Sequence, residues 1–378
     1  MARRKAILAV ALVALAAYAW ASAALMAERH SDISWFVVAG GAGVDAARIP
    51  AGLSVIPGIG GYDGMAFYRL ALDPFTRKAT DFGITLDNPA YRQQRVLYPL
   101  IVHLLSFGRA EFVPTLLVIV NLIAVVFLTM AATRLAIACG LHPLWGLLVP
   151  AYPGLFIAFS RDTSEVVAWA FAMSAIHAFT VKQWRTATAL LCCAVLTRET
   201  TLVLALSLAA VFAWELARRR ERSFPAITFI APIAIYASWQ AILRSWWGVT
   251  GLAAGAVDAA VPFSGFLRVF VAALSRHTVL MRIHYAECVF WAVVVCAVAV
   301  IFLRTTAATP WRIAWLTYLA LGSILAEDVW TEHISFMRVL SDLSAMCAVL
   351  LFGANAKLRA LVLCATCGLS YYVMSHMR

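Results

Sequence analysis

The sequence predicts an all-α fold, a polytopic transmembrane helix bundle of about 10–12 spans with a long first loop on its outer face. Hydrophobic residues make up 63% of the chain and charged residues only 13%. A soluble domain is nearer half apolar and a quarter charged, because it must cover its surface with polar groups. Apolar runs of helix length recur along the chain, and basic residues gather in the connections between them. We therefore expect lipid to be the solvent.

The first apolar run predicts a retained transmembrane helix over 6–27. It follows Arg3, Arg4 and Lys5, the charge order that a cleaved signal peptide also has. The apolar core of a signal peptide is usually only ~7–15 residues long, whereas a helix spans the bilayer with ~20. We expect the amino terminus to lie in the cytoplasm.

The segment 28–95 is the longest polar stretch and is predicted to be an outer loop. It is rich in glycine and proline, but aromatic and apolar residues run through it, so disorder is disfavoured. Its glycines lack the spacing of a phosphate-binding loop. We expect 1–378 to form a single integral-membrane domain, with 96–378 as the helix bundle.

Further apolar runs predict the rest of the bundle. The run 96–107 is too short to span and is expected not to cross. The stretch 186–216 is too long for one helix and is broken by the polar residues Thr197 to Thr200. The runs are 96–107, 112–133, 143–160, 163–180, 186–197, 200–216, 225–243, 286–304, 311–326, 337–354 and 358–375.

The basic connections predict the orientation. With all of them in the cytoplasm, every turn satisfies the positive-inside rule, and the polar clusters share the outer face. The net charge of +11 is explained by these connections and by anionic lipid headgroups, so no nucleic-acid partner is expected. We expect a multi-pass protein of the bacterial cytoplasmic membrane with its site facing outward. The connections are the amino terminus, Arg134, 182–185, 218–222, 304–312 and 357–359.

Asp63 is the candidate catalytic residue. It lies in the outer loop between aromatic residues, where a carboxylate near lipid and rings can act as a general base. The alternative is an interfacial aromatic belt in which Asp63 caps a helix.

Arg92 and Arg95 are candidates for binding a phosphate group. They lie where the outer loop turns toward the bilayer, and two guanidinium groups can hold a phosphate bidentately. The alternative is a pair of arginines that extend their head groups to the membrane surface.

Two further clusters place ionisable residues at the membrane boundary. Arg161, Asp162 and Glu165 form one, and Arg198 and Glu199 form the other. A charge at mid-membrane costs ~2.5–3.5 kcal/mol to insert, so such residues usually face a cavity or pair with one another. The pairs Arg161–Glu165 and Arg198–Glu199 are the local, purely structural alternative.

A last cluster runs from Glu327 to His333, with Arg338 just inside the next helix. Its acidic and histidine neighbours lack the spacing of a preformed metal site. We expect no metal and no cofactor.

The order of these motifs resembles the GT-C glycosyltransferase superfamily. An aromatic-Asp-Gly-x-x-Phe-Tyr-Arg-x-Ala motif around Asp63 follows the first helix, and Leu97-Tyr98-Pro99 opens the next apolar stretch. The likeness is strongest to the mannosyltransferases that add the second mannose in glycosylphosphatidylinositol assembly, and to their bacterial relatives. Other matching positions are Tyr68, Pro153, Ser164-Glu165, Thr197-Arg198 and Arg338.

The resemblance implies a hexosyl- or pentosyltransferase that takes a sugar from a polyprenyl-phosphate donor on the outer side of the membrane, usually with inversion. Asp63 would remove the proton of the acceptor hydroxyl, on a lipid, a glycan or a protein. Arg92 and Arg95 first, and other arginines second, would stabilise the departing phosphate, and the apolar helices would hold the prenyl tail. The full set of donor-phosphate and substrate-binding candidates is Arg92, Arg95, Tyr98, Arg161, Asp162, Glu165, Arg198, Glu199 and Arg338.

Two other functions fit the same residues. A transporter or flippase of a lipid-linked or anionic substrate also needs arginines around a membrane cavity, although matched broken helices in the two halves are not evident here. In a non-enzymatic assembly subunit, the polar clusters would only hold helices together.

Overall fold

The structure, a computed structural model, describes residues 2–29, 31–255, 260–275, 278–304 and 309–376. Over these residues the fold is helical apart from one small antiparallel ladder, which pairs β1 (Thr80–Asp81) with β2 (Ile84–Thr85). The predicted all-α class is confirmed.

Among the described residues, five helical segments are long and apolar enough to cross a membrane by length and composition. Their apolar side chains also point outward: Leu12 is 62% exposed and Phe127 56% exposed, which suits contact with lipid. The other helices of the bundle are shorter or less apolar. The five segments are Arg3–Ala27, Ala110–Ala138, Glu199–Ala217, Ile227–Trp247 and Met281–Leu303.

The helices of the bundle follow most of the predicted runs. They are α1 (Ala2–Ala27), α5 (Val113–Ala138), α7 (Glu165–Thr180), α8 (Trp184–Thr197), α9 (Leu202–Ala217), α10 (Ile227–Trp247), α12 (Ser264–Ser275), α13 (Val279–Arg304), α14 (Thr309–Ser323), α17 (Ser341–Leu351) and α18 (Ala356–His376). The central helix is α7, which is buried on nearly all sides and packs against α5 and α8.

Two predicted runs are divided in the structure. The run 143–160 becomes a 3-10 helix, η3 (Pro143–Leu148), and a short helix, α6 (Pro153–Phe159). Pro150 and Pro153 explain the break, since proline has no N–H to donate and disfavours helix at the residue before it. The run 337–354 is likewise shared between α16 (His333–Val339) and α17, with α15 (Glu327–Thr331) before them.

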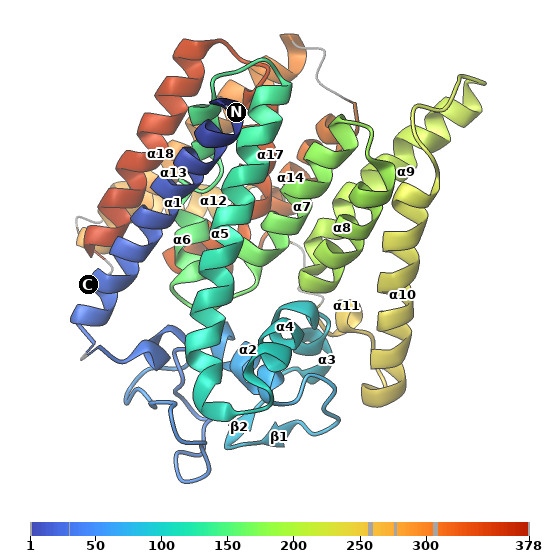
Figure 1. The fold of residues 1–378 in the computed structure, drawn as a ribbon. Helices are drawn as coiled ribbons and strands as arrows, with labels where there is room; N and C mark the ends of the chain where they lie inside the picture. The colour runs from blue at the N-terminus through green and yellow to red at the C-terminus, as the bar shows by residue number, and fades with distance from the viewer. Residues whose placement is uncertain (1, 30, 256–259, 276–277, 305–308, 377–378) are drawn as a thin grey trace.

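The segment 28–95 contains more structure than a loop. It holds η1 (Ile33–Phe36), α2 (Asp63–Leu72), the β-ladder and α3 (Pro89–Gln93). The next helix, α4 (Leu97–Ser106), packs on α2 and α5. Together these elements cover one end of the bundle (Figure 1).

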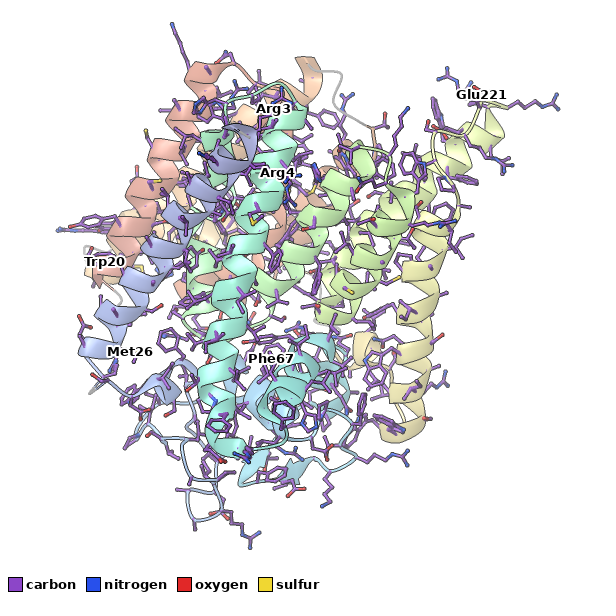
Figure 2. All side chains as sticks on the ribbon, viewed as in Figure 1. Arg3, Arg4, Trp20, Met26, Phe67 and Glu221 are labelled. Atoms are coloured by element: carbon purple, nitrogen blue, oxygen red, sulfur yellow. The ribbon has the colours of Figure 1, made fainter. Side chains whose placement is uncertain are left out.

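The amino-terminal arginines and the arginine-rich connection between α9 and α10 lie at the same end of the bundle. Arg3 and Arg4 lie at one end, as does Glu221 in the arginine-rich connection between α9 and α10, whereas Phe67 lies toward the other end (Figure 2). The end capped by α2, α3 and α4 is therefore opposite to this basic connection.

Candidate functional site

Asp63 is the first residue of α2, and close backbone packing fixes its position. A Cβ atom on the next residue, Gly64, would lie only 2.4 Å from the carbonyl oxygen of Arg161 and 2.8 Å from that of Val37. No side chain fits there. Gly64 therefore lets the start of α2 dock onto the junction between α6 and α7.

The carboxylate of Asp63 lies between two arginines from distant parts of the chain. Nη1 of Arg92, on α3, is 2.5 Å from Oδ1 of Asp63. Nη1 of Arg338, on α16, is 2.7 Å from Oδ2. Arg92 also donates two hydrogen bonds of 2.8 Å to Asp87, so its guanidinium is shared between two carboxylates.

The alternation of charges continues into the bundle. Arg338 lies 3.2 Å from Glu165, at the start of α7, and Glu165 also pairs with Arg198. Nε of Arg198 is 3.4 Å from Oδ2 of Asp342, on α17. The whole series, which we call the charge network, is Asp87, Arg92, Asp63, Arg338, Glu165, Arg198 and Asp342.

Exposure falls from one end of the charge network to the other. The side chains of Arg92, Asp63 and Arg338 are 18%, 15% and 11% exposed, whereas those of Glu165, Arg198 and Asp342 are only 1–5% exposed. A ligand can therefore reach the Asp63 end of the network directly. The Asp342 end of the network is buried within the bundle.

A second ion pair lies beside the network. Arg95 donates two hydrogen bonds to the carboxylate of Glu199, with N–O distances of 2.8 and 2.5 Å, and a third of 2.6 Å to the hydroxyl of Tyr91. Bidentate pairing of this kind fixes the orientation of both groups. It joins the segment before α4 to η4 (Glu199–Thr201), which follows α8.

The arginines control the protonation of Asp63. Burial on its own would raise the pKa of this carboxyl, but Arg338, Arg92 and Arg95 together hold the pKa well below its ordinary value. The pKa of Asp87 is also lowered, chiefly by its hydrogen bonds from Arg92. Asp63 is therefore an ionised carboxylate at neutral pH, and it is a weak base while both arginines are in place.

Neither of the local pairs considered from the sequence forms. Glu165 pairs with Arg198 and Arg338 and not with Arg161, and Glu199 pairs with Arg95 and not with Arg198. In both cases the partner comes from a different segment of the chain.

Three candidate residues lie outside both the charge network and the Arg95–Glu199 pair. The hydroxyl of Tyr98 donates to the carbonyl of Leu117 and accepts from Asn121, between α4 and α5. Asp162 is fully buried, has a positive φ of 49°, and its carboxylate oxygens have no hydrogen-bond partner among the described residues. The side chain of Arg161 enters a separate pocket.

Asp342 was not predicted to belong to the site. Its carboxylate accepts a hydrogen bond of 2.7 Å from Nε1 of Trp169 and pairs with Arg198. It is a single carboxylate within the apolar run 337–354, and an ionisable residue inside such a run is the signal that would have found it.

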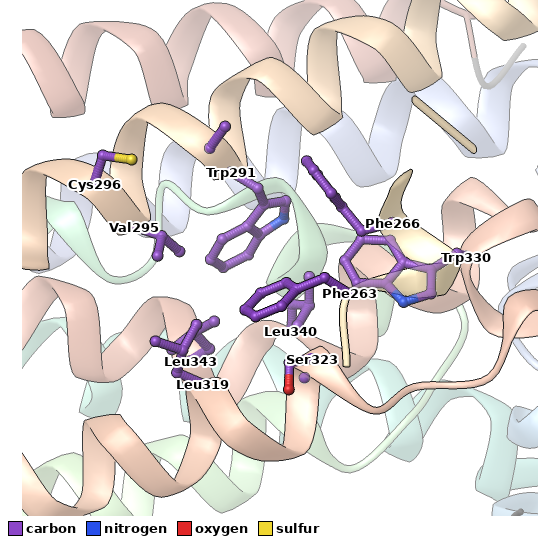
Figure 3. A pocket seen from close by; sticks show the side chains of 12 residues that line it. Phe263, Phe266, Trp291, Val295, Cys296, Leu319, Ser323, Trp330, Leu340 and Leu343 are labelled. Atoms are coloured by element: carbon purple, nitrogen blue, oxygen red, sulfur yellow. The ribbon is translucent and has the colours of Figure 1, made fainter. Parts of the chain in front are cut away.

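An apolar pocket of about 130 Å³ opens beside α16. Phe263, Trp291 and Trp330 contribute aromatic side chains to it (Figure 3). Leu340, which also lines the pocket, follows Arg338 by two residues in the sequence. None of the residues that line the pocket belongs to the charge network, and Leu340 is the one that lies nearest to Arg338 along the chain.

Within the described part of the chain, no three His, Cys, Asp or Glu side chains come together in a way that would hold a metal ion. The charged groups that converge on the site are instead arginine–carboxylate pairs.

No protein-family model, curated protein or solved structure matches this chain. The fold and composition define its class as an all-α helical protein with several helices apolar enough for a membrane.

Proposed function

We propose that the chain is a glycosyltransferase that moves a sugar from a polyprenyl-phosphate donor to an acceptor hydroxyl at the outer face of the membrane. The observation that carries the proposal is the Asp63 carboxylate held between Arg92 and Arg338 at the more exposed end of the charge network. The candidate base, Asp63, is thus in direct contact with two arginines that could bind a phosphate.

Four carboxylates and three arginines make up the charge network, so each arginine is already paired with a carboxylate before any phosphate binds. The donor phosphate must replace a carboxylate on an arginine. Asp63 is the carboxylate that Arg92 and Arg338 share. It is more accessible than Glu165 and Asp342, which are almost completely buried, and only Asp87, at the outer end of the network, is more exposed. Donor binding then transfers Arg92 and Arg338 from Asp63 to the phosphate.

This exchange would activate Asp63. Without its two arginines, the carboxylate loses the interactions that keep its pKa low, and burial raises its basicity. The acceptor oxygen attacks the anomeric carbon, its proton passes to Asp63, and the bond from that carbon to the phosphate oxygen breaks. The phosphate leaves with the bonding electron pair, and the arginines stabilise its charge.

The apolar pocket beside α16 is the proposed place for the first isoprene units of the donor. Its aromatic and leucine lining suits a prenyl chain, and it begins two residues from Arg338. In this arrangement the protein is a multi-pass protein of the bacterial cytoplasmic membrane, and the capped end of the bundle faces outward.

The test is transfer from radiolabelled polyprenyl-phosphate sugars in membranes that contain the wild type, Asp63→Asn or Asp45→Asn. Asp45 is the matched control, because it lies in the same segment but pairs only with the exposed Arg48. Loss of a general base lowers the rate by about 10²–10⁴-fold, so we expect that loss in Asp63→Asn alone, at equal protein levels.

Two outcomes would contradict the proposal in different ways. Undiminished transfer by Asp63→Asn would remove Asp63 as the base. No transfer by the wild type from any donor, together with substrate-dependent flux in proteoliposomes, would favour a transporter.

A further inference from the structure

A pocket that contains two arginines, Arg29 and Arg161, lies on the same end of the bundle as Asp63 but outside the charge network. It is enclosed by the end of α1, by η1 and by the junction between α6 and α7, and it has a volume of about 70 Å³. A cavity needs only ~10–15 Å³ to hold one water, so this pocket accepts a larger group.

Arg161 is the principal residue of this pocket. No carboxylate lies within ion-pairing distance of its guanidinium among the described residues, and its one hydrogen bond, to the carbonyl of Ser160, is long at 3.4 Å. Every arginine of the charge network has a carboxylate partner. Among the described residues, Arg161 therefore has no carboxylate paired with its positive charge.

The rest of the lining favours an anion with an apolar attachment. The guanidinium of Arg29 lies 4.6 Å from the centre of the Trp35 ring and adds a second positive charge. The one carboxylate in the lining, Asp32, already accepts hydrogen bonds from the backbone of Ser34 and the hydroxyl of Ser54. The remaining lining is largely apolar and includes Leu25, Met26 and Phe36.

We propose that this pocket binds the phosphate of an anionic lipid headgroup. Guanidinium groups match phosphate oxygens in geometry as well as in charge. Leu25 and Met26 belong to the last turn of α1, whose apolar segment is long enough to span a bilayer and ends at Ala27. The pocket therefore lies where a membrane-spanning helix emerges, which is the level of lipid headgroups.

This site is separate from the proposed donor site and does not depend on it. The carbonyl of Arg161 faces Gly64, and Tyr62 lies between the two sites, with Arg338 against its ring. Among the described residues, the Arg161 side chain makes no ion pair with the network. A headgroup in this pocket leaves Arg92 and Arg338 free to bind the donor. The pocket would bind lipid even in a protein with no transferase activity.

The experiment measures lipid retention by native mass spectrometry on the full chain, taken from nanodiscs of phosphatidylcholine with a minor share of phosphatidylglycerol. The proteins compared are the wild type, Arg161→Gln, Arg29→Gln and Arg48→Gln. Arg48 is the matched control, since it lies in the same outer segment and its side chain is 79% exposed. Inorganic phosphate is titrated in a parallel arm.

We expect the wild type and Arg48→Gln to retain phosphatidylglycerol in preference to phosphatidylcholine. Arg161→Gln should bind it about tenfold more weakly or worse, because a charge-assisted hydrogen bond is lost, and Arg29→Gln should show a smaller loss. If Arg161→Gln does not fold, Arg161→Lys provides the comparison, since lysine keeps the positive charge but loses the planar guanidinium that binds a phosphate with two hydrogen bonds.

Equal retention by all four proteins would overturn the proposal. So would competition by inorganic phosphate without any preference for phosphatidylglycerol, because the pocket would then bind a free anion and not a headgroup. Loss of retention confined to the Arg161 and Arg29 variants would support it, whatever the transferase assay shows.

Discussion

The pair formed by Arg95 and Glu199 makes the sharpest prediction about what holds the site together. Its two side chains are 6% and 12% exposed and are joined by two hydrogen bonds. The perturbation is a cycle of three variants: Arg95→Met, Glu199→Gln and the double variant. Methionine keeps most of the length of the arginine side chain, and glutamine keeps the shape of glutamate.

The magnitude follows from the geometry. Unit charges about 2.8 Å apart attract by about 6 kcal/mol at an effective dielectric constant near 20, and taking each ion out of water costs several kcal/mol. The intact pair therefore comes close to balance. Removal of Arg95 alone leaves Glu199 buried without its partner, which costs about 3–5 kcal/mol. The double variant buries no charge at this position, so it should be about 2 kcal/mol more stable than Arg95→Met.

The assay is equilibrium unfolding in detergent micelles, monitored by tryptophan fluorescence, for all four proteins. The expected coupling energy is at least about 2 kcal/mol, because each single variant leaves one buried charge unpaired and the double variant leaves none; this is well outside the ~0.3–0.5 kcal/mol within which independent sites add. Additive losses from the two single variants would refute the reasoning, because they would mean that water replaces either partner at no cost.

Three other predictions follow from single features of the site. Asp63 has a lowered pKa in the folded state, so its contribution to stability should be present above its ordinary value of 3.8 and lost as the pH falls below it; a pH series of unfolding should show this slope in the wild type but not in Asp63→Asn. Gly64→Ala should abolish transfer and lower stability, because the added Cβ meets two backbone carbonyls, whereas Gly60→Ala, with open space around it, should be close to wild type in both measurements. Trp169→Phe should destabilise the protein by about 1–3 kcal/mol in chemical unfolding, because the buried Asp342 loses a hydrogen bond; stability equal to that of the wild type would show that Asp342 is protonated or hydrated.

Apolar length was enough to predict the long helices. The runs 6–27 and 112–133 correspond to α1 and α5, since their sequences contain few polar residues or prolines. Where polar residues lie on a buried face, the same reasoning failed. The helix α13 begins at Val279, whereas the predicted run began at 286. The prediction missed its first turns because the buried His284 and Glu287 and the exposed Arg282 interrupt the apolar pattern. The amphipathic helix α12 was not predicted at all.

The candidate residues could be chosen from the sequence, but their partners could not. Charged residues stand out in an apolar sequence, so the sequence alone is enough to predict Asp63, Arg92 and Arg338 as site residues. Their pairing depends on which helices become neighbours, and Asp63 and Arg338 are brought together only when α2 and α16 meet at one end of the bundle. Spacing along one helix predicts only local pairs, and here those did not form.

The position of Arg338 near the end of the chain has a consequence for synthesis. A ribosome makes Asp63 and Glu165 long before α16, so both carboxylates exist for a time without the arginine that they share, Arg338. Arg92 and Arg198 can each pair with one of them during this time, and only the arrival of α16 joins the two halves of the charge network. A chain released before residue 338 would therefore carry two separate ion pairs, Asp63 with Arg92 and Glu165 with Arg198, in place of one continuous network.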